Sequence, residues 1–130
     1  MSQENVEVVQ AAYVDLSGPE DPRWDRVHED VEVYDHDIMD AGEYRGHAGF
    51  VSWTEDWSSA WAEFATEPEE FLDVGDRVVM TFSMKATGLT SGVAIERQDA
   101  MVFEVRDGKI MRMDYYNSRA QALTSVGLEA

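Results

Sequence analysis

The stretch that decides the fold covers residues 77–116 and reads RVVMTFSMKATGLTSGVAIERQDAMVFEVRDGKIMRMDYY. It contains three segments with the period-two pattern of half-buried strands, at residues 77–86, 93–105 and 110–116. Residues 87–92 between the first two are rich in turn formers, and Asp107-Gly108 between the last two is a strong hairpin signal. The stretch therefore predicts a run of three antiparallel strands.

Helical patterns occur on both sides of this stretch. The first helix has one apolar face made by Val6, Val9, Tyr13 and Leu16. A short helix is expected from Arg23 to about His28, because Asp21-Pro22 is a helix start signal. The longest helix is expected to carry one continuous aromatic stripe, made by Phe50, Trp53, Trp57, Trp61 and Phe64. Ser118 is expected to cap a final helix that ends at Gly127.

Two more strands complete the predicted sheet. Residues 31–36 alternate in the manner of a strand, and residues 70–74 run into the turn signal at Gly75-Asp76. Pro68 places the start of that second strand at a sheet edge or a bulge. This order of elements predicts one α+β domain over residues 1–130, in which helices cover the concave face of a curved antiparallel sheet and enclose a pocket.

Composition excludes several classes of function. The 130 residues include 27 acidic and 10 basic side chains, for a net charge of −17, which opposes binding to nucleic acids and anionic membranes. The absence of cysteine excludes disulfides and thiolate chemistry. The three histidines lack metal-ligand spacing, and no phosphate-binding loop or serine-hydrolase motif occurs. No apolar run is long enough to span a membrane, and the polar N-terminus favours a cytoplasmic protein.

The ordered set of motifs resembles the SnoaL-like branch of the nuclear transport factor 2 and ketosteroid isomerase superfamily. The resemblance spans nearly the whole chain and rests on Val31–Asp35, Tyr44–His47, Glu69–Phe71, Gly75–Val79 and Arg106–Ile110, together with Trp57 and Trp61. It implies a cone-shaped domain that forms a homodimer and binds a small hydrophobic molecule without a metal or cofactor. The superfamily includes isomerases, dehydratases, polyketide cyclases, epoxide hydrolases and binding domains, so the reaction stays open.

Three residues are candidates for acid–base chemistry. Asp35 shares strand parity with Val31 and Val33, which would place its carboxylate in the cavity, and the resemblance puts it at the general-base position. Tyr13 is the polar-tipped residue on the inner face of the first helix and matches the family's oxyanion-hole tyrosine. Asp99 matches the donor position if the strand is aligned on Phe103, but counting from the hairpin puts Ala100 there instead. The other interpretation of Asp99 is a surface aspartate beside Arg97.

Asp114 is the candidate for a different reaction. The segment around it resembles the last strand of limonene-type epoxide hydrolases, in which an aspartate helps to drive the attack of water, although residues 78–86 lack the expected partner Arg and Asp. The other interpretation is an outer aspartate paired with Arg112 or Arg119. The expected pocket wall consists of Trp53, Trp57, Phe82, Met101 and Tyr115.

The sequence therefore favours cofactor-free isomerisation, dehydration or cyclisation of a hydrophobic substrate. In this hypothesis Asp35 moves the proton, while Tyr13, together with Asp99, stabilises the enolate oxygen. The alternatives are an epoxide hydrolase that uses Asp114 and a binding domain without turnover. For the homodimer, residues 77–130 are the expected contact, because they are close to electrically neutral whereas residues 1–76 carry the whole of the acid excess.

Overall fold

The computed structural model describes residues 2–17, 23–36, 43–59 and 61–128. In this part of the chain it has three helices and six strands, which follow one another as α1 (Ser2–Ser17), β1 (Val27–Asp35), β2 (Glu43–Arg45), α2 (Gly46–Ser58), β3 (Trp61–Val74), β4 (Arg77–Gly88), β5 (Ala94–Arg106), β6 (Lys109–Tyr116) and α3 (Arg119–Ser125). No helix among these is long and apolar enough to cross a lipid bilayer.

The strands form one curved, unclosed sheet in the order β2-β1-β6-β5-β4-β3. Strands β3 to β6 are an antiparallel meander, as the sequence predicts. Strand β1 pairs with β6 in parallel, so the sheet is mixed and the prediction of a purely antiparallel sheet is wrong at this one pair. Such a parallel pair needs a long connection, and α2 together with the meander supplies it.

The two faces of the sheet carry different clusters of apolar side chains. The inner face includes Val33, Met80, Phe82 and Phe103, and α1 and α2 cover it, as the sequence predicts for the helices. The outer face carries Val79, Ala100 and Val102, against which Ala122 and Leu123 of α3 pack. Neighbouring residues of one strand, such as Val78 and Val79, thus belong to different clusters.

Two predicted helical segments differ from the structure. The short helix over 23–28 is wrong, because residues 25–26 form a turn and β1 already begins at Val27. The aromatic stripe is not one helix face, since α2 ends at Ser58 and both Trp61 and Phe64 lie in β3. The hydroxyls of Ser58 and Ser59 bond to backbone carbonyls at the end of α2, and pairing with β4 then fixes the following residues as a strand.

Local signals for turns and caps are confirmed. Strand β3 is an edge strand, and its register shifts between Pro68 and Glu70. Asp107 and Gly108 have φ angles of 51° and 76°, which is the left-handed backbone of a type I′ hairpin turn. Ser118 is the N-cap of α3 and accepts a hydrogen bond from the backbone N–H of Gln121.

Candidate functional site

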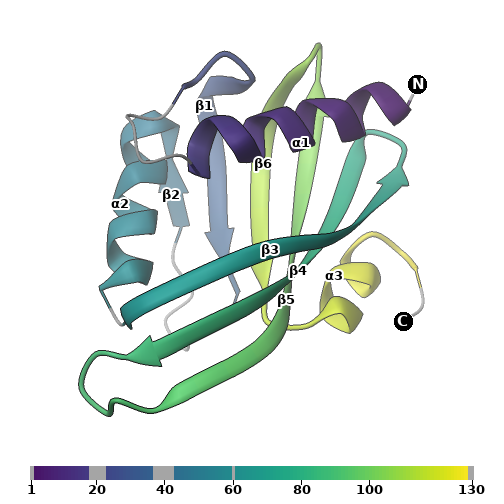
Figure 1. The fold of residues 1–130 in the computed structure, drawn as a ribbon. Coiled ribbons are helices and arrows are strands. Elements are labelled where there is room, and N and C mark those ends of the chain that lie inside the picture. Colours follow the sequence, from purple (N-terminus) through teal and green to yellow (C-terminus); the bar gives the residue numbers. More distant parts are fainter. Residues whose placement is uncertain (1, 18–22, 37–42, 60, 129–130) are drawn as a thin grey trace.

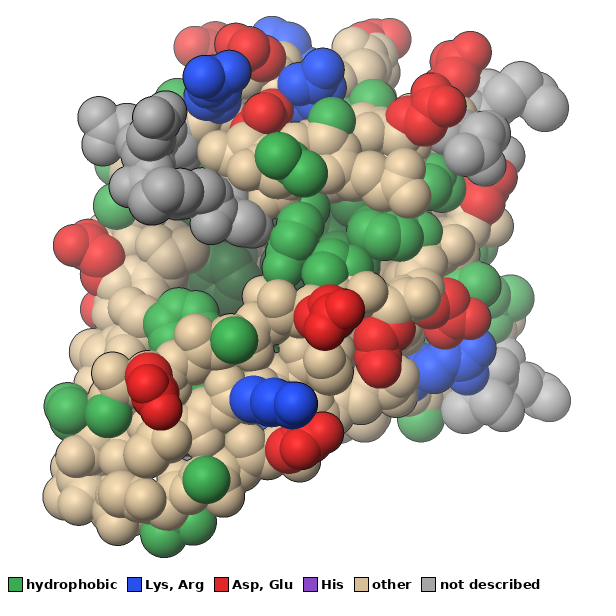
Figure 2. Space-filling model, in the orientation of Figure 1, with side chains coloured by type: hydrophobic (Ala, Val, Ile, Leu, Met, Phe, Trp, Pro, Cys, Tyr) green, Lys and Arg blue, Asp and Glu red, His purple; other side chains and the backbone are tan. Residues whose placement is uncertain are grey.

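A cavity of about 490 Å³ lies between the inner face of the sheet and helices α1 and α2. Figure 2 shows a hollow between α1 and β3 where hydrophobic side chains gather. Its wall is built by Ala12, Tyr13, Leu16, Phe50, Trp53, Thr54, Phe64, Ala65, Thr66, Met80, Phe82, Met101, Phe103, Ile110, Met113 and Tyr115. None of these described wall residues carries a charge, so the cavity suits a neutral and mainly apolar ligand.

Asp35 lies directly behind this wall. It is 2% exposed, and its Oδ2 accepts a hydrogen bond of 2.8 Å from the indole Nε1 of Trp53. Asp35 is also the register partner of Tyr115 on β6, so two wall residues flank it. The carboxylate of Asp35 is therefore buried directly behind an apolar wall and accepts a hydrogen bond from a residue of that wall.

Asp99 also lies on the inner face and is fully buried. It accepts a hydrogen bond from the hydroxyl of Tyr115, and its Oδ1 lies 2.7 Å from Nε of Arg97. The two alignments of this strand differ by one residue, and the structure decides between them. Asp99 pairs with Phe82 of β4, whose side chain belongs to the inner cluster. Counting from Phe103 gives the observed face.

The Tyr115 hydroxyl is the polar end of a wall residue that is only 3% exposed. Burial and the hydrogen bond to Asp99 raise the pKa of Tyr115 far above its usual value, while Arg97 has a smaller opposite effect. The side chain therefore stays neutral at every pH at which the protein works. Its ring also packs edge-on against Trp53 and Phe82, with centroid separations of 5.9 and 5.8 Å.

Tyr13 reaches from α1 to the edge strand. Its hydroxyl lies 2.9 Å from Oγ1 of Thr66 and 3.3 Å from the backbone carbonyl oxygen of the same residue. Both side chains are half-buried and both belong to the cavity wall. This contact spans the hollow between α1 and β3, so the predicted oxyanion donor lies at the side of the cavity opposite the sheet centre.

Asp114 lies on the outer face, away from the cavity. Arg112 Nε is 2.8 Å from its Oδ2, and His36 Nε2 is 2.8 Å from its Oδ1. The carboxylate raises the pKa of Arg112, mainly through this hydrogen bond. Arg112 also lies over the ring of Tyr34, 4.2 Å from its centroid. Asp114 is therefore the arginine-paired outer aspartate that the sequence offered as the alternative interpretation.

The structure brings most of the predicted residues together. Tyr13, Trp53, Phe82, Met101 and Tyr115 belong to one wall, while Asp35 and Asp99 are each bonded to a member of it. The side chain of Trp57 lies outside the described part of the structure. Sequence reasoning named Arg97 as the neighbour of Asp99 but missed Thr66. Strand parity, which relates Thr66 to Phe64, is the signal that could have found it.

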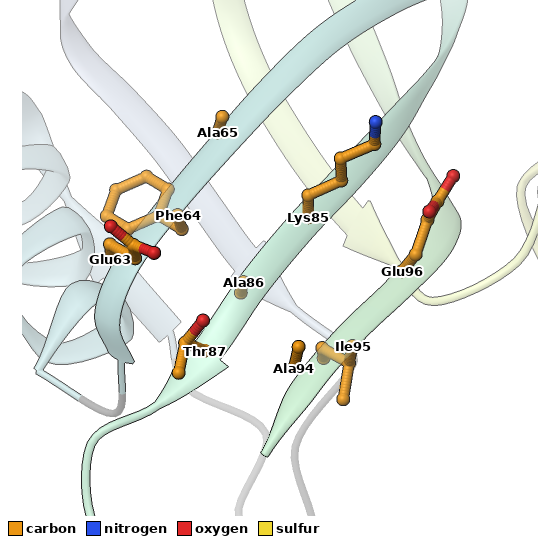
Figure 3. Close-up of a pocket in the computed structure, with 9 residues that line it drawn as sticks. All are labelled: Glu63, Phe64, Ala65, Lys85, Ala86, Thr87, Ala94, Ile95 and Glu96. Atoms are coloured by element: carbon orange, nitrogen blue, oxygen red, sulfur yellow. The ribbon is translucent and has the colours of Figure 1, made fainter. Parts of the chain in front are cut away.

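A second hollow crosses the projecting ends of β3, β4 and β5 (Figure 3). It has a volume of about 450 Å³ and shares Phe64 and Ala65 with the cavity. Lys85 and Glu96 are register partners and project side by side from β4 and β5. Because the hollow is formed by exposed strand ends and contains none of the predicted catalytic groups, the enclosed cavity is the candidate active site.

No described residues form a cluster of three or more side chains that could hold a metal ion. The polar groups in the cavity wall and directly behind it are carboxylates, hydroxyls and an indole N–H. The curved sheet and the cavity beneath its helices are those of an α+β domain of the cone-shaped class.

The comparisons with known proteins agree with this class. A profile of the SnoaL-like domain matches residues 22–113. The chain therefore belongs to the SnoaL-like domain family. A search of curated proteins finds no relative with significant sequence similarity.

Several solved structures share the fold. One is TerC, crystallised with polyporic acid, which is 24% identical with a TM-score of 0.71 over 95% of this chain and 98% of that one. A second is a candidate SnoaL-like polyketide cyclase from Jannaschia sp. CCS1, 17% identical with a TM-score of 0.74 over 99% and 95%. A third, from Catenulispora acidiphila, has a ketosteroid isomerase-like fold and holds trimethylamine; it is 17% identical with a TM-score of 0.72 over 94% and 93%.

Proposed function

We propose that this protein is a cofactor-free enzyme that moves a proton on a neutral, hydrophobic carbonyl compound. The observation that carries the proposal is a buried carboxylate, Asp35, bonded to Trp53 in the wall of an uncharged cavity. Neighbours of the same fold that are described as a candidate polyketide cyclase, or that hold a small molecule, support this class of function. The reaction is an isomerisation, a dehydration or a cyclisation.

The chemistry begins with the carboxylate of Asp35, which takes a proton from the carbon next to the carbonyl group. The electron pair moves to the carbonyl oxygen, and the hydroxyl of Tyr13 stabilises the enolate that forms. Return of the proton at another carbon gives an isomer. Loss of a β-hydroxyl, which takes the proton from Asp35 and leaves as water, gives a dehydrated product. Attack of the enolate carbon on a second carbonyl, whose oxygen then takes that proton, gives a ring. Each path restores Asp35 to its carboxylate form.

Asp99 has a different role in this proposal from the one that the sequence suggested. Asp99 accepts a hydrogen bond from Tyr115 and lies beside the guanidinium of Arg97, so we assign it the role of an acceptor. It instead fixes the hydroxyl, and hence the ring, of Tyr115 in the wall. The donor role therefore falls to Tyr13.

The test is a turnover assay on a matched panel of an enolisable ketone, a dienol, a β-hydroxy ketone and an epoxide. Wild type should turn over at least one of the first three. Tyr13→Phe should lower kcat more than it weakens binding, because an oxyanion donor acts mainly in the transition state. Opening of the epoxide that depends on Asp114 would support the hydrolase instead, although the position of Asp114 on the outer face speaks against it.

A binding domain without turnover is the second candidate. It is favoured by the fact that Asp99 and Asp114 are both paired with an arginine, so their charges serve structure. This candidate predicts that the protein binds the ketone tightly and does not convert it into a product over hours. In that case Asp35→Asn would alter affinity only.

We also propose that the protein forms a homodimer through its outer sheet face. Cross-strand register places a row of alternating charges across that face, in the order Arg77, Glu104, Arg112, Glu32 and Arg45. Such a row lets two acidic molecules meet with little repulsion. Sedimentation should find a dimer at roughly 0.15 M salt, where the screening length is about 8 Å. A monomer at high micromolar concentration would contradict this.

A further inference from the structure

The polar groups of the cavity wall differ in whether their hydrogen-bonding protons are available to a ligand. The indole N–H of Trp53 is donated to Asp35, the hydroxyl of Tyr115 is donated to Asp99, and the hydroxyl of Thr54 is donated to the carbonyl oxygen of Val51 at 2.8 Å. Each of these groups has one proton, and each proton already has an acceptor. None of the three is a ready donor for a ligand.

Tyr13 and Thr66 differ from these groups because they are two hydroxyls that bond to each other. Their oxygens are 2.9 Å apart, and either can be the donor. One proton lies between them, so the pair keeps a second proton. The competing acceptor inside the protein is the carbonyl oxygen of Thr66, which is 3.3 Å from the Tyr13 oxygen and so makes a weak contact. Among the described wall residues, this pair alone has a proton to spare.

From this count we infer that Tyr13 and Thr66 together form the binding site for the carbonyl oxygen of the ligand. Thr66 donates to the oxygen of Tyr13, and Tyr13 donates to the ligand. A chain of two hydroxyls polarises the outer proton and makes it a stronger donor than an isolated tyrosine. Thr66 is thus a positioning residue, and its place on β3 sets the direction in which the Tyr13 proton points.

The site also fixes how the ligand lies. The oxygen is held on the side of the cavity where α1 meets β3, and the apolar body extends toward Phe82, Met101 and Met113 on the inner face of the sheet. A ligand in this orientation passes Trp53 and Tyr115, the two wall residues behind which Asp35 lies. The binding part of this inference stands alone, and only its catalytic consequence rests on the proposed function.

The experiment compares two neutral ligands of the same shape. These are 2-acetylnaphthalene, which has a carbonyl oxygen, and 2-isopropenylnaphthalene, in which a methylene group replaces that oxygen. Calorimetry measures both affinities for wild type, Thr66→Val and Thr66→Ser. Thr66→Val should weaken binding of the ketone by roughly threefold to tenfold and leave the alkene unchanged, because one hydrogen bond is lost. Thr66→Ser keeps the hydroxyl and should bind the ketone as wild type does.

Two further variants sharpen the result. The double variant Tyr13→Phe, Thr66→Val should lose no more affinity for the ketone than the single variant with the larger loss, because the two hydroxyls act as one unit. Thr54→Val removes the other threonine hydroxyl of the wall and should leave the ratio of the two affinities at its wild-type value, because that proton is already bonded to Val51.

The inference is overturned if Thr66→Val weakens both ligands equally, or neither. That result can coincide with full loss of turnover in Asp35→Asn, in which case the proposed function survives and the donor pair does not. Conversely, selective loss of the ketone without any turnover in wild type would support the donor pair in a binding domain and refute the enzyme.

Discussion

Asp35 and Asp114 are near neighbours in the sheet, on the adjacent strands β1 and β6, yet they face opposite sides. Asp35 faces inward and is held by the indole N–H of Trp53. Asp114 faces outward and is held by Arg112 and His36. Both carboxylates are buried, with 2% and 6% exposure, so burial does not distinguish them.

The difference lies in the partners. A carboxylate paired with a guanidinium has its charge neutralised, and proton transfer to it must work against that cation. Asp35 accepts the uncharged indole N–H of Trp53, a residue of the cavity wall. The comparison teaches that two buried aspartates of one sheet can have different surroundings, because the inner one lies behind an apolar wall and the outer one belongs to an ion-pair network.

The largest expected effect is on turnover, when Asp35 and Asp114 are each replaced by asparagine. Asp35→Asn keeps the shape of the side chain but removes the proton acceptor, so turnover should fall by roughly 10²–10⁴-fold. Asp114→Asn is the matched control, and its turnover should stay close to wild type because the cavity is untouched. Steady-state kinetics on whichever ketone wild type accepts measures both variants. Equal losses in the two variants would show that the faces do not differ in function.

A smaller effect is expected at the partner of Asp35. Trp53→Phe keeps an aromatic wall but removes the N–H, so kcat should fall by about 10- to 100-fold with little change in KM. Trp24→Phe removes an indole that stacks on His47 outside the cavity wall and should leave kcat close to its wild-type value. A Trp53→Phe enzyme with the wild-type kcat would contradict the positioning role.

The smallest effect concerns stability at high pH. The folded state raises the pKa of Tyr115, so below pH 10 the residue is neutral in both states and its contribution is constant. As pH rises further, the unfolded chain releases this proton and the fold does not, so the free energy of unfolding falls by up to about 1.4 kcal/mol per pH unit. Urea unfolding of Tyr115→Phe should show a shallower alkaline decline. Parallel curves for wild type and variant would rule out the burial effect.

Much of the inner face could be predicted because strand alternation is a local pattern. The alternating residues of β4, and Tyr115 on β6, follow from spacing alone. The facing of Asp99 could not, because the choice between Asp99 and Ala100 depends on the residue that anchors the alignment, and a shift of one residue exchanges the two faces. Asp114 precedes Tyr115 directly in β6, so the same alternation turns its side chain outward.

The errors share one physical origin, which is contact between distant segments. Trp61 and Phe64 have helical spacing from Trp53, but pairing with β4 made them part of a strand. The parallel pairing of β1 with β6 was missed because no local signal marks it. The hydrogen bond between Tyr13 and Thr66 joins residues 53 positions apart, so no local sequence pattern links the two.

The central claim is that the substrate binds in the cavity between the sheet and helices α1 and α2, and not on the outer face or in the second hollow. Methionine methyl groups report on this directly, because Met80, Met101 and Met113 belong to the cavity wall and Met111 does not. In ¹³C-methyl spectra titrated with 2-acetylnaphthalene, the three wall methyls should shift together and saturate, while the Met111 signal should stay in place. Saturable shifts of Met111 alone, with the wall methyls unmoved, would contradict the account.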